Sequence, residues 1–339
     1  MRTKNIFTTI FIIMIISSLA GWVYAKDKYI LKFATIAPEG TTWMNTMRQM
    51  NKEIKEASGG RLSIRFYPGG VMGDELVVLR KMRINQVHGG GFSGVGLGEI
   101  LPEVRILDLP YMFRNYDEVD YVHNQLFDRF AKDYDKKGYV LMGWAEVGFV
   151  NLLSKYEVTG MESLGKVKLW AWQDDPIAQA VFKEMNIATI PLAVTDVLTA
   201  LQTGMIDTVY SPPLGALALQ WYTRVKYINS FPITHSTGAV LVSNKFFRKL
   251  PADLQLILKD KFAKYLKILV QQSRQDNAEA IKTLKENGLI VTDLSEQEIA
   301  RLVDKSRSVC ADLAGKLYPQ DIYNHLITLL ETYRNEKKK

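Results

Sequence analysis

The chain has 339 residues, of which 47% are hydrophobic and 23% charged, and its formal net charge is +7 at pH 7. These values are ordinary for globular proteins and exclude a disordered, collagen-like or polytopic membrane protein. A single cysteine, Cys310, excludes a disulfide framework and a multi-cysteine metal site, and four histidines leave little material for a histidine cluster. We therefore expect neither a metal nor a cofactor.

The first 25 residues have the layout of a secretory signal peptide. Arg2 and Lys4 form a positive start, residues 6–16 form an apolar run, and Val23 and Ala25 flank Tyr24 where a signal peptidase reads small residues. The apolar run is shorter than the roughly 20 residues that a membrane span needs. We expect cleavage after residue 25 and export to the periplasm.

The positive charge does not point to nucleic acid. The predicted signal peptide contains two of the 43 Lys and Arg residues and none of the 36 Asp and Glu residues. Its removal lowers the formal charge from +7 to +5. Charges of both signs are interspersed, and residues 331–339 are expected to form a basic tail. We expect no nucleic-acid partner and a monomer.

The mature chain opens with a strand–helix–strand pattern. Residues 28–35 alternate apolar and polar side chains, Thr41 or Thr42 can cap a following helix, and residues 61–67 read as a second strand. A helix is expected over residues 74–84. Strands joined by a helix pair in parallel, which indicates an α/β fold.

The rest of the chain repeats this alternation. A glycine-rich stretch over residues 87–98 precedes a polar helix and a set of short strands and helices. The expected helices are 116–136, 176–185 and 195–204, and the expected strands are 139–144, 167–172, 187–192, 206–210 and 239–243.

A helix of more than thirty residues is expected over 251–287, with Pro251 at its start. At 1.5 Å per residue it would be about 50 Å long, which exceeds one lobe of this size. It must bend or run across two lobes. The pattern favours a two-lobed α/β protein with a ligand cleft between the lobes and a long helix spanning both.

No catalytic constellation is found. His88-Gly89-Gly90-Gly91 resembles the oxyanion loop of esterases, but the sequence has no Gly-x-Ser-x-Gly elbow, and Ser93 lies in the glycine run without that pattern. We interpret this stretch as a tight turn whose backbone approaches a ligand or a neighbouring strand. Asp174 and Asp175 precede Pro176 and are interpreted as a helix cap.

Open α/β sheets bind ligands beyond the carboxyl ends of their strands, and a cleft between lobes is a favoured ligand site. The residues alone thus indicate a periplasmic binding protein that closes by hinge motion on a small solute.

Five segments resemble the substrate-binding proteins of TRAP transporters, the DctP-like family. They match the family's aromatic-Pro-x-Gly-x-x-Gly loop, its Leu-Pro-aromatic-x-Phe segment, its Leu-Lys-Gly-Leu-Lys-Ile-Arg segment, a long stretch that resembles the family most closely, and the segment before its long helix. In this sequence they are residues 67–75, 107–113, 164–168, 191–207 and 243–251.

The resemblance implies two α/β lobes crossed by a long helix, with lobe I over residues 26–147 and 237–275 and lobe II over 148–236 and 276–330. It also implies a membrane permease as partner, driven by an ion gradient, and an organic acid as ligand. In the family an arginine holds the carboxylate with its forked guanidinium.

We assign the position of that arginine to Lys168, and a second basic position of the family to Val150, so the bidentate clamp is missing. Lys168 either donates to a carboxylate as a point charge or is a surface lysine at a strand edge. Trp170 shares its strand face, because side chains alternate. We expect a pocket that is less charged and more apolar than the family norm.

The other candidate ligand contacts lie in loops that match the family's cleft. They are Glu39, Thr41, Trp43, Glu75, Phe92, Ser93, Phe149, Tyr210 and Ser211. The expected ligand is a bulky or aromatic carboxylate, with a neutral molecule as the alternative. Two other classes stay open: a secreted serine hydrolase that uses Ser93, and a binding protein of an ABC-type or sensor system.

Overall fold

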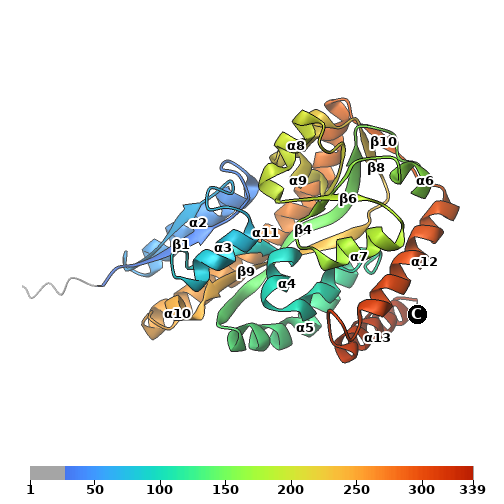
Figure 1. Ribbon diagram of the computed structural model, residues 1–339. Helices are drawn as coiled ribbons and strands as arrows, with labels where there is room; N and C mark the ends of the chain where they lie inside the picture. The colour runs from blue at the N-terminus through green and yellow to red at the C-terminus, as the bar shows by residue number, and fades with distance from the viewer. Residues whose placement is uncertain (1–26, 339) are drawn as a thin grey trace, which may run out of the picture.

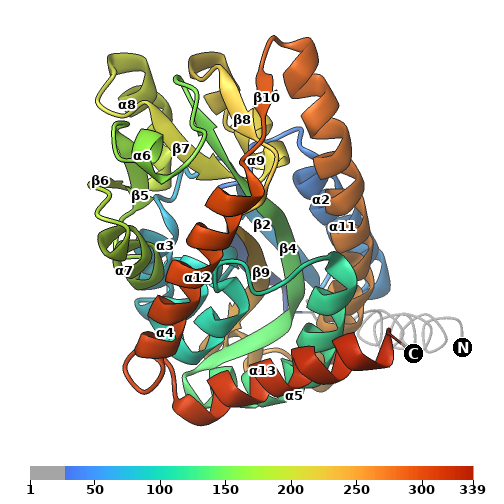
Figure 2. The ribbon, with the colours of Figure 1, turned by 90° about the vertical axis from the view of Figure 1, so that its right-hand side faces the viewer.

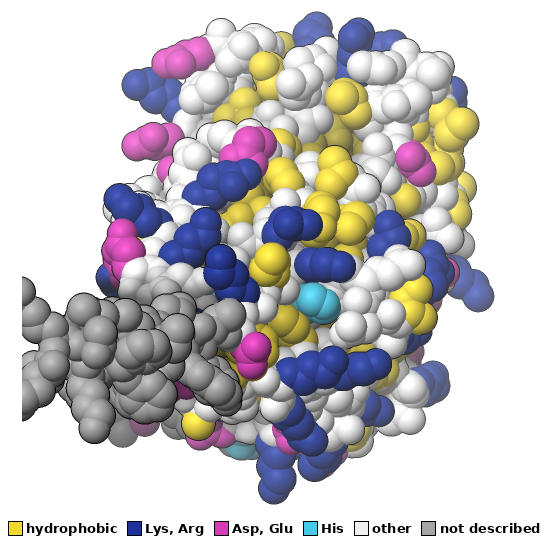
Figure 3. All heavy atoms as spheres, turned by 90° about the vertical axis from the view of Figure 1, so that its left-hand side faces the viewer, with side chains coloured by type: hydrophobic (Ala, Val, Ile, Leu, Met, Phe, Trp, Pro, Cys, Tyr) yellow, Lys and Arg dark blue, Asp and Glu magenta, His cyan; other side chains and the backbone are white. Residues whose placement is uncertain are grey.

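The computed structural model describes residues 27–338. The predicted signal peptide over residues 1–25 lies outside the described residues. Within the described range, no helix has the length and apolar character needed to span a membrane. On the face seen in Figure 3, Lys and Arg side chains are spread among acidic and hydrophobic ones.

Ten strands join in one sheet with the order β2-β1-β3-β9-β4-β7-β5-β6, and β8 and β10 lie off this path. Their bounds are β1 Tyr29–Ala34, β2 Leu62–Tyr67, β3 Gly89–Ser93, β4 Tyr139–Ser154, β5 Leu169–Trp172, β6 Thr189–Leu192, β7 Thr208–Ser211, β8 Tyr227–Asn229, β9 Thr234–Ser243 and β10 Ile290–Thr292.

Helices cover both parts of this sheet (Figure 1). The α-helices are α2 Thr42–Ala57, α3 Glu75–Arg83, α4 Gly94–Ile100, α5 Tyr116–Lys136, α6 Met161–Leu164, α7 Pro176–Glu184, α8 Val197–Thr203, α9 Pro213–Ala218, α10 Asn244–Phe247, α11 Ala252–Glu286, α12 Glu296–Leu313 and α13 Gln320–Glu336. Three short 3₁₀ helices are η1 Pro102–Asp108, η2 Val194–Asp196 and η3 Trp221–Arg224.

The strand β4 divides the sheet into two half-sheets. Its residues up to Val150 pair with β9, and its last four residues pair with β7. The first half-sheet is β2-β1-β3-β9 with the first part of β4, and the second is the end of β4 with β7, β5, β6, β8 and β10. With their helices they form the first and second lobes of the predicted two-lobed α/β fold.

Two bulges let β4 pass between the half-sheets. The register with β9 shifts at Gly143 and at Gly148, whose φ angles are 155° and 118°. Only glycine adopts such angles readily, and bulges bend and twist a strand. At Gly148 a β-carbon would also lie 2.6 Å from Nδ2 of Asn277 on α11.

The long helix α11 connects the two lobes, as expected. It packs against α2 and β4 in the first lobe and against α9 in the second, and Figure 2 shows it along one side of the molecule. Asn277 joins both sides, because its Nδ2 donates to the carbonyl of Val147 at 2.9 Å and its Oδ1 accepts from the amide of Leu214 at 3.0 Å.

The strand–helix–strand opening is confirmed, with parallel β1 and β2 and with Thr41 capping α2. Asp175 caps α7, as expected. The glycine-rich stretch is not a tight turn: it forms β3, which pairs with β1 and β9, and then α4. Glycine is required there because a β-carbon at Gly89 would lie 2.9 Å from the carbonyl oxygen of Leu241.

Sequence reasoning missed the two C-terminal helices. The helix α12 packs against α7, and α13 packs against α5 and η1 in the first lobe. Arg334 of α13 donates to both carboxylate oxygens of Glu118 on α5 at 2.8 Å. Residues 331–336, expected in a basic tail, therefore belong to α13, and only the last lysines follow the helix. The predicted lobe boundaries stay a prediction.

An ion cluster at the lobe crossing generates a stability prediction. The guanidinium of Arg274 on α11 binds the buried carboxylate of Glu146 at 2.6 Å and that of Asp120 at 2.6 Å. Arg274→Ala should lower the free energy of unfolding by about 3–5 kcal/mol, because it leaves a buried charge without its partner.

Urea denaturation of the purified protein measures this loss. Lys282→Ala, on the exposed side of the same helix, is the matched control and should stay within about 0.5 kcal/mol of wild type. Equal stabilities of the two variants would contradict the role given to Arg274.

Candidate functional site

A cavity of about 330 Å³ lies between the two lobes. Its walls come from the loop after β1, the end of β3 and η1 in the first lobe, and from β5, β7, α7 and α9 in the second. This volume suits a small organic molecule.

Eight of the predicted contact residues line this cavity. They are Thr41, Trp43, Glu75, Phe92, Ser93, Trp170, Tyr210 and Ser211. Loops that are far apart in the sequence thus meet at one place, because β3, β5 and β7 end at the boundary between the half-sheets.

Lys168 is not among the lining residues, which corrects the expectation for this position. Its side chain is exposed, and its Nζ donates to the carbonyl of Gly204 at 3.0 Å. The strand β5 begins only at Leu169, so Lys168 lies before the strand on the outer side. Matched letter by letter, the seven-residue segment of the family places its arginine at Trp170, two positions further on.

Phe149 and Glu39 also lie outside the cavity lining. Phe149 on β4 packs against Tyr116 and His235, with ring centroids 4.9 Å and 5.3 Å apart. Glu39 accepts a hydrogen bond from Nε of Arg48 at 2.6 Å on the surface. The loop after β1 turns Glu39 away, while Thr41 and Trp43 point inward.

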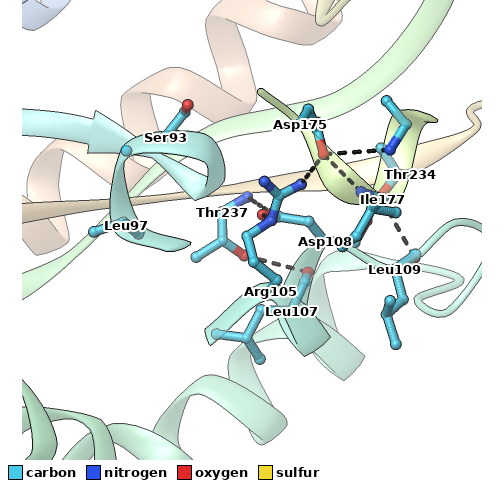
Figure 4. Close-up of polar contacts among 12 residues, drawn as sticks. Ser93, Leu97, Arg105, Leu107, Asp108, Leu109, Asp175, Ile177, Thr234 and Thr237 are labelled. Atoms are coloured by element: carbon cyan, nitrogen blue, oxygen red, sulfur yellow. Dashed lines mark hydrogen bonds and ion pairs between the residues drawn. The ribbon is translucent and has the colours of Figure 1, made fainter. Parts of the chain in front are cut away.

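A buried guanidinium crosses the cavity from one lobe to the other. Arg105 of η1 donates from Nη2 to Oδ1 of Asp175 at 3.0 Å, and its Nε lies 3.2 Å from Oδ2 of Asp108 (Figure 4). Asp175 also accepts from the amides of Ile177 and Ala178. Among the described residues, neither Nη1 nor Nε of Arg105 makes a hydrogen bond. Nε is buried beside Asp108, so Nη1 is the nitrogen that can serve a ligand.

The two carboxylates around Arg105 differ in their surroundings. Burial raises the pKa of Asp108 to about 6, although Arg105 and the amide of Thr237 oppose this rise. Asp175 is held by the first amides of α7, where a helix favours negative charge. The guanidinium is therefore largely neutralised before any ligand enters.

A second contact joins the lobes at Trp172. Its Nε1 donates to Oδ2 of Asp74 at 3.0 Å, and the amide of Val194 donates to the same oxygen at 3.4 Å. Asp74 caps α3 in the first lobe, whereas Trp172 and Val194 belong to the second. Together with the pair of Arg105 and Asp175, this contact describes a closed arrangement of the lobes.

Glu75 is a buried carboxyl group at the cavity wall. Its oxygens accept from the amide of Ser93 at 2.8 Å, the hydroxyl of Ser93 at 3.0 Å and the amide of Gly96 at 2.9 Å. Burial raises the pKa of Glu75 to about 7, and the nearby charge of Asp74 adds to this rise.

Aromatic rings form the wall of the cavity in the second lobe. The ring of Trp170 stacks on that of Tyr210 with centroids 4.9 Å apart and meets that of Trp221 at 5.3 Å. Nε1 of Trp170 donates to the carbonyl of Leu192, and Oη of Tyr210 accepts from the amide of Trp172. Because protein groups satisfy these polar atoms, the rings offer mainly flat apolar surface to a ligand.

The site lacks the parts of a hydrolase. The hydroxyl of Ser93 donates to Glu75, and no histidine lines the cavity among the described residues. His88 instead stacks on Phe246 with ring centroids 4.5 Å apart. In the described part of the chain, no group of His, Cys, Asp or Glu side chains is arranged to hold a metal ion.

Comparison with known proteins places this fold and cavity in one class. Residues 33–316 match the family described as "Bacterial extracellular solute-binding protein, family 7", DctP. A solute-binding protein of Verminephrobacter eiseniae is 27% identical over 263 residues, which cover 77% of this chain and 76% of that protein.

Two solved structures are similar in fold. The sugar acid binding protein DctPAm of Advenella mimigardefordensis, in complex with galactonate, matches with a TM-score of 0.85 and 21% identity over 90% of this chain and 99% of that one. A TRAP periplasmic solute binding protein of Desulfovibrio salexigens, with bound orotic acid, matches with a TM-score of 0.80 and 19% identity over 90% and 98%.

The family match over residues 33–316 thus identifies a solute-binding protein of a transporter, not an enzyme. Within that class, the chain belongs to the DctP family of TRAP solute-binding proteins. The hydrolase alternative is therefore wrong. The alternative of an ABC-type or sensor-coupled binding protein stays a prediction, because the comparisons do not show the partner.

Sequence reasoning missed the charged part of the site. Arg105, Asp108 and Asp175 line the cavity, yet they lie apart in the sequence and form no recognisable motif. The one available signal for Arg105 is a basic residue inside the apolar segment over residues 104–107. Asp175 was predicted as a helix cap, but its ion pair with Arg105 depends on where η1 packs in the fold.

The raised pKa of Glu75 predicts a pH dependence of stability. Between its usual value of 4.5 and about 7, the folded state holds a proton that the unfolded chain has released. This contribution to stability is full below about pH 4.5 and is lost as the pH rises through about 7. From pH 5 to pH 8, wild type should lose on the order of 2 kcal/mol relative to Glu75→Gln.

Urea denaturation at several pH values measures this difference. Asp108, which titrates in the same range, is present in both proteins and cancels in the comparison. A difference in unfolding free energy that stays constant from pH 5 to pH 8 would show that Glu75 keeps its ordinary pKa.

Proposed function

We propose that this protein is the periplasmic subunit of a TRAP transporter that captures a bulky, largely apolar monocarboxylate and delivers it unchanged to the membrane permease. The signal peptide predicted for residues 1–25 and the family support export to the periplasm. We propose that it acts as a monomer. The cavity between two lobes supports capture by closure of the lobes around the solute.

The observation that carries the ligand class is the combination of one guanidinium with an aromatic wall. Two nitrogens of Arg105 face Asp108 and Asp175, and Nη1 is left to donate to one carboxylate oxygen. Trp170, at the matched position of the family's arginine, presents a ring where the family presents a charge. A ligand with a single carboxylate and a large apolar body satisfies both features.

The ligands named for the similar structures support an acid. Galactonate and orotic acid each carry a carboxylate, although these proteins share only 21% and 19% identity with this chain. The polar hydroxyls of galactonate would find few partners at the aromatic wall. We therefore place the ligand of this protein nearer to an aryl or alkyl carboxylic acid than to a sugar acid.

A neutral solute is the second candidate, and the charges around Arg105 favour it. The guanidinium already faces two carboxylates, and Glu75 adds a third acidic group to the cavity wall. An entering anion must overcome this excess of negative charge, unless Asp108 or Glu75 takes up a proton. Binding of an acid should therefore strengthen as the pH falls from 8 to 6, whereas binding of a neutral solute should not.

A matched pair of probes tests the proposal. 3-Phenylpropanoate should bind at least tenfold more tightly than 3-phenylpropanamide, because only the acid pairs with Arg105. Tryptophan emission and a thermal shift report binding, since four tryptophans line the cavity and a ligand of the folded state raises its apparent stability. Equal affinities would favour the neutral solute, and binding of neither probe nor any other aryl or alkyl acid would contradict the proposal.

Two variants locate the anchor. Arg105→Lys should weaken binding of 3-phenylpropanoate at least tenfold, because a lysine keeps the charge but loses the planar fork that serves Asp175 and the ligand together. Lys168→Ala is the matched control and should leave the affinity within twofold, because Lys168 lies outside the cavity. If Lys168→Ala weakened binding and Arg105→Lys did not, Lys168 would be the residue that binds the carboxylate.

A further inference from the structure

Apolar side chains form part of the lining of the cavity that also contains Arg105. In addition to the wall described above, its lining includes side chains of α6, α7 and α12. Figure 2 shows α12 beside α7 on one side of the molecule, and the two helices are in contact. We call this part of the cavity the α7–α12 branch and define it by Ile177, Val181, Met185, Leu164, Leu302 and Ser306.

One face of α7 forms the length of the branch. Ile177, Val181 and Met185 are spaced four residues apart, so they lie on the same side of the helix. From the first to the last of them the wall extends about 12 Å, at 1.5 Å per residue. Leu164 and Leu302 close the opposite side from α6 and α12. The wall is therefore long and almost wholly hydrocarbon.

The branch starts at the charged end of the site. Asp175, which pairs with Arg105, is the N-cap of α7, and Ile177 of the branch donates its amide to the same carboxylate. A group bound at Nη1 of Arg105 thus lies next to the first turn of the helix whose face forms the wall. Arg105 and the six residues of the branch line the same cavity.

Ser306 is the one polar side chain among the six residues that define the branch, and a hydrocarbon tail beside it would leave its hydroxyl without a partner. The residue is fully buried, it lines the cavity, and its hydroxyl has no hydrogen-bond partner among the described residues. Native proteins leave few buried polar atoms in this state.

We propose that the ligand is an amphipathic acid whose carboxylate lies at Arg105 and whose extended hydrocarbon tail lies in the α7–α12 branch. This inference rests on the proposed function and narrows it from a bulky acid to one with a long apolar tail. Burial of the tail supplies the affinity, and Arg105 fixes its orientation.

Two probe series test the branch. Straight-chain carboxylates from propanoate to tetradecanoate, and the 1-alkanols of equal length, are titrated below their micelle concentrations and followed by tryptophan emission and calorimetry. Affinity for the acids should rise about threefold to fourfold per added methylene until the branch is full, and then level off.

The series separate the inference from the proposed function. If the acids bind with an affinity that does not depend on chain length, the placement of the tail in the branch is wrong, while the contact of the carboxylate with Arg105 is retained. If the affinity for the alkanols rises with chain length and the acids do not bind, the branch is supported and the contact of a carboxylate with Arg105 is wrong. Absence of a length dependence in both series overturns the branch.

Variants on α7 locate the tail. Val181→Trp fills the branch and should weaken decanoate at least tenfold while leaving propanoate within twofold. Gln179→Trp places the same ring on the exposed side of α7 and is the control, with both affinities unchanged. Equal weakening of both acids by Val181→Trp overturns the placement. Should this variant lack a cooperative melt, Ala178→Leu narrows the same cavity wall with less added volume and is held to the same pattern.

Discussion

The buried charge of Arg105 is the constraint on which the site depends. A guanidinium removed from water must be paired, and its partners come from different parts of the chain: Asp108 from its own 3₁₀ helix and Asp175 from the second lobe. The pairing fixes η1 against the start of α7 and so sets the relative position of the lobes at the cavity. Since Nε is buried beside Asp108 and Nη2 bonds to Asp175, Nη1 is the nitrogen that can serve a ligand, which limits how an acid can be held.

The rest of the fold makes this pairing possible. The strand β4 serves both half-sheets, and its bulges at Gly143 and Gly148 let it turn from one to the other. The helix α11 packs on both lobes, and Asn277 bonds to both. Charged and aromatic residues from distant segments therefore meet between the lobes. Movement of the lobes must break few contacts there, chiefly those of Arg105 and of Asp74 with Trp172.

The cavity offers a ligand more aromatic and aliphatic surface than charge. The ring of Trp170 stacks on that of Tyr210 and meets that of Trp221 edge to face. Aromatic and aliphatic walls bind through area removed from water, which grows with the length of the ligand. A single partly neutralised guanidinium adds direction to that binding. The two features together suit a molecule that is polar at one end only.

The sequence by itself determined the local elements, the two-lobed α/β class and the family, because strand alternation, helix caps such as Thr41 and short motifs are written in neighbouring residues. It also predicted Tyr210 and Glu75 as ligand contacts from segments that match the family, and Trp170 from its strand face; all three line the cavity. Tertiary structure alone decided which charge reaches the cavity. Lys168 lies outside the cavity lining, one residue before β5 begins, whereas Arg105 of η1 lines the cavity and pairs with Asp175 at the start of α7. Such pairings join residues some seventy positions apart. Periodicity and local spacing in the sequence carry no information about contacts of this kind.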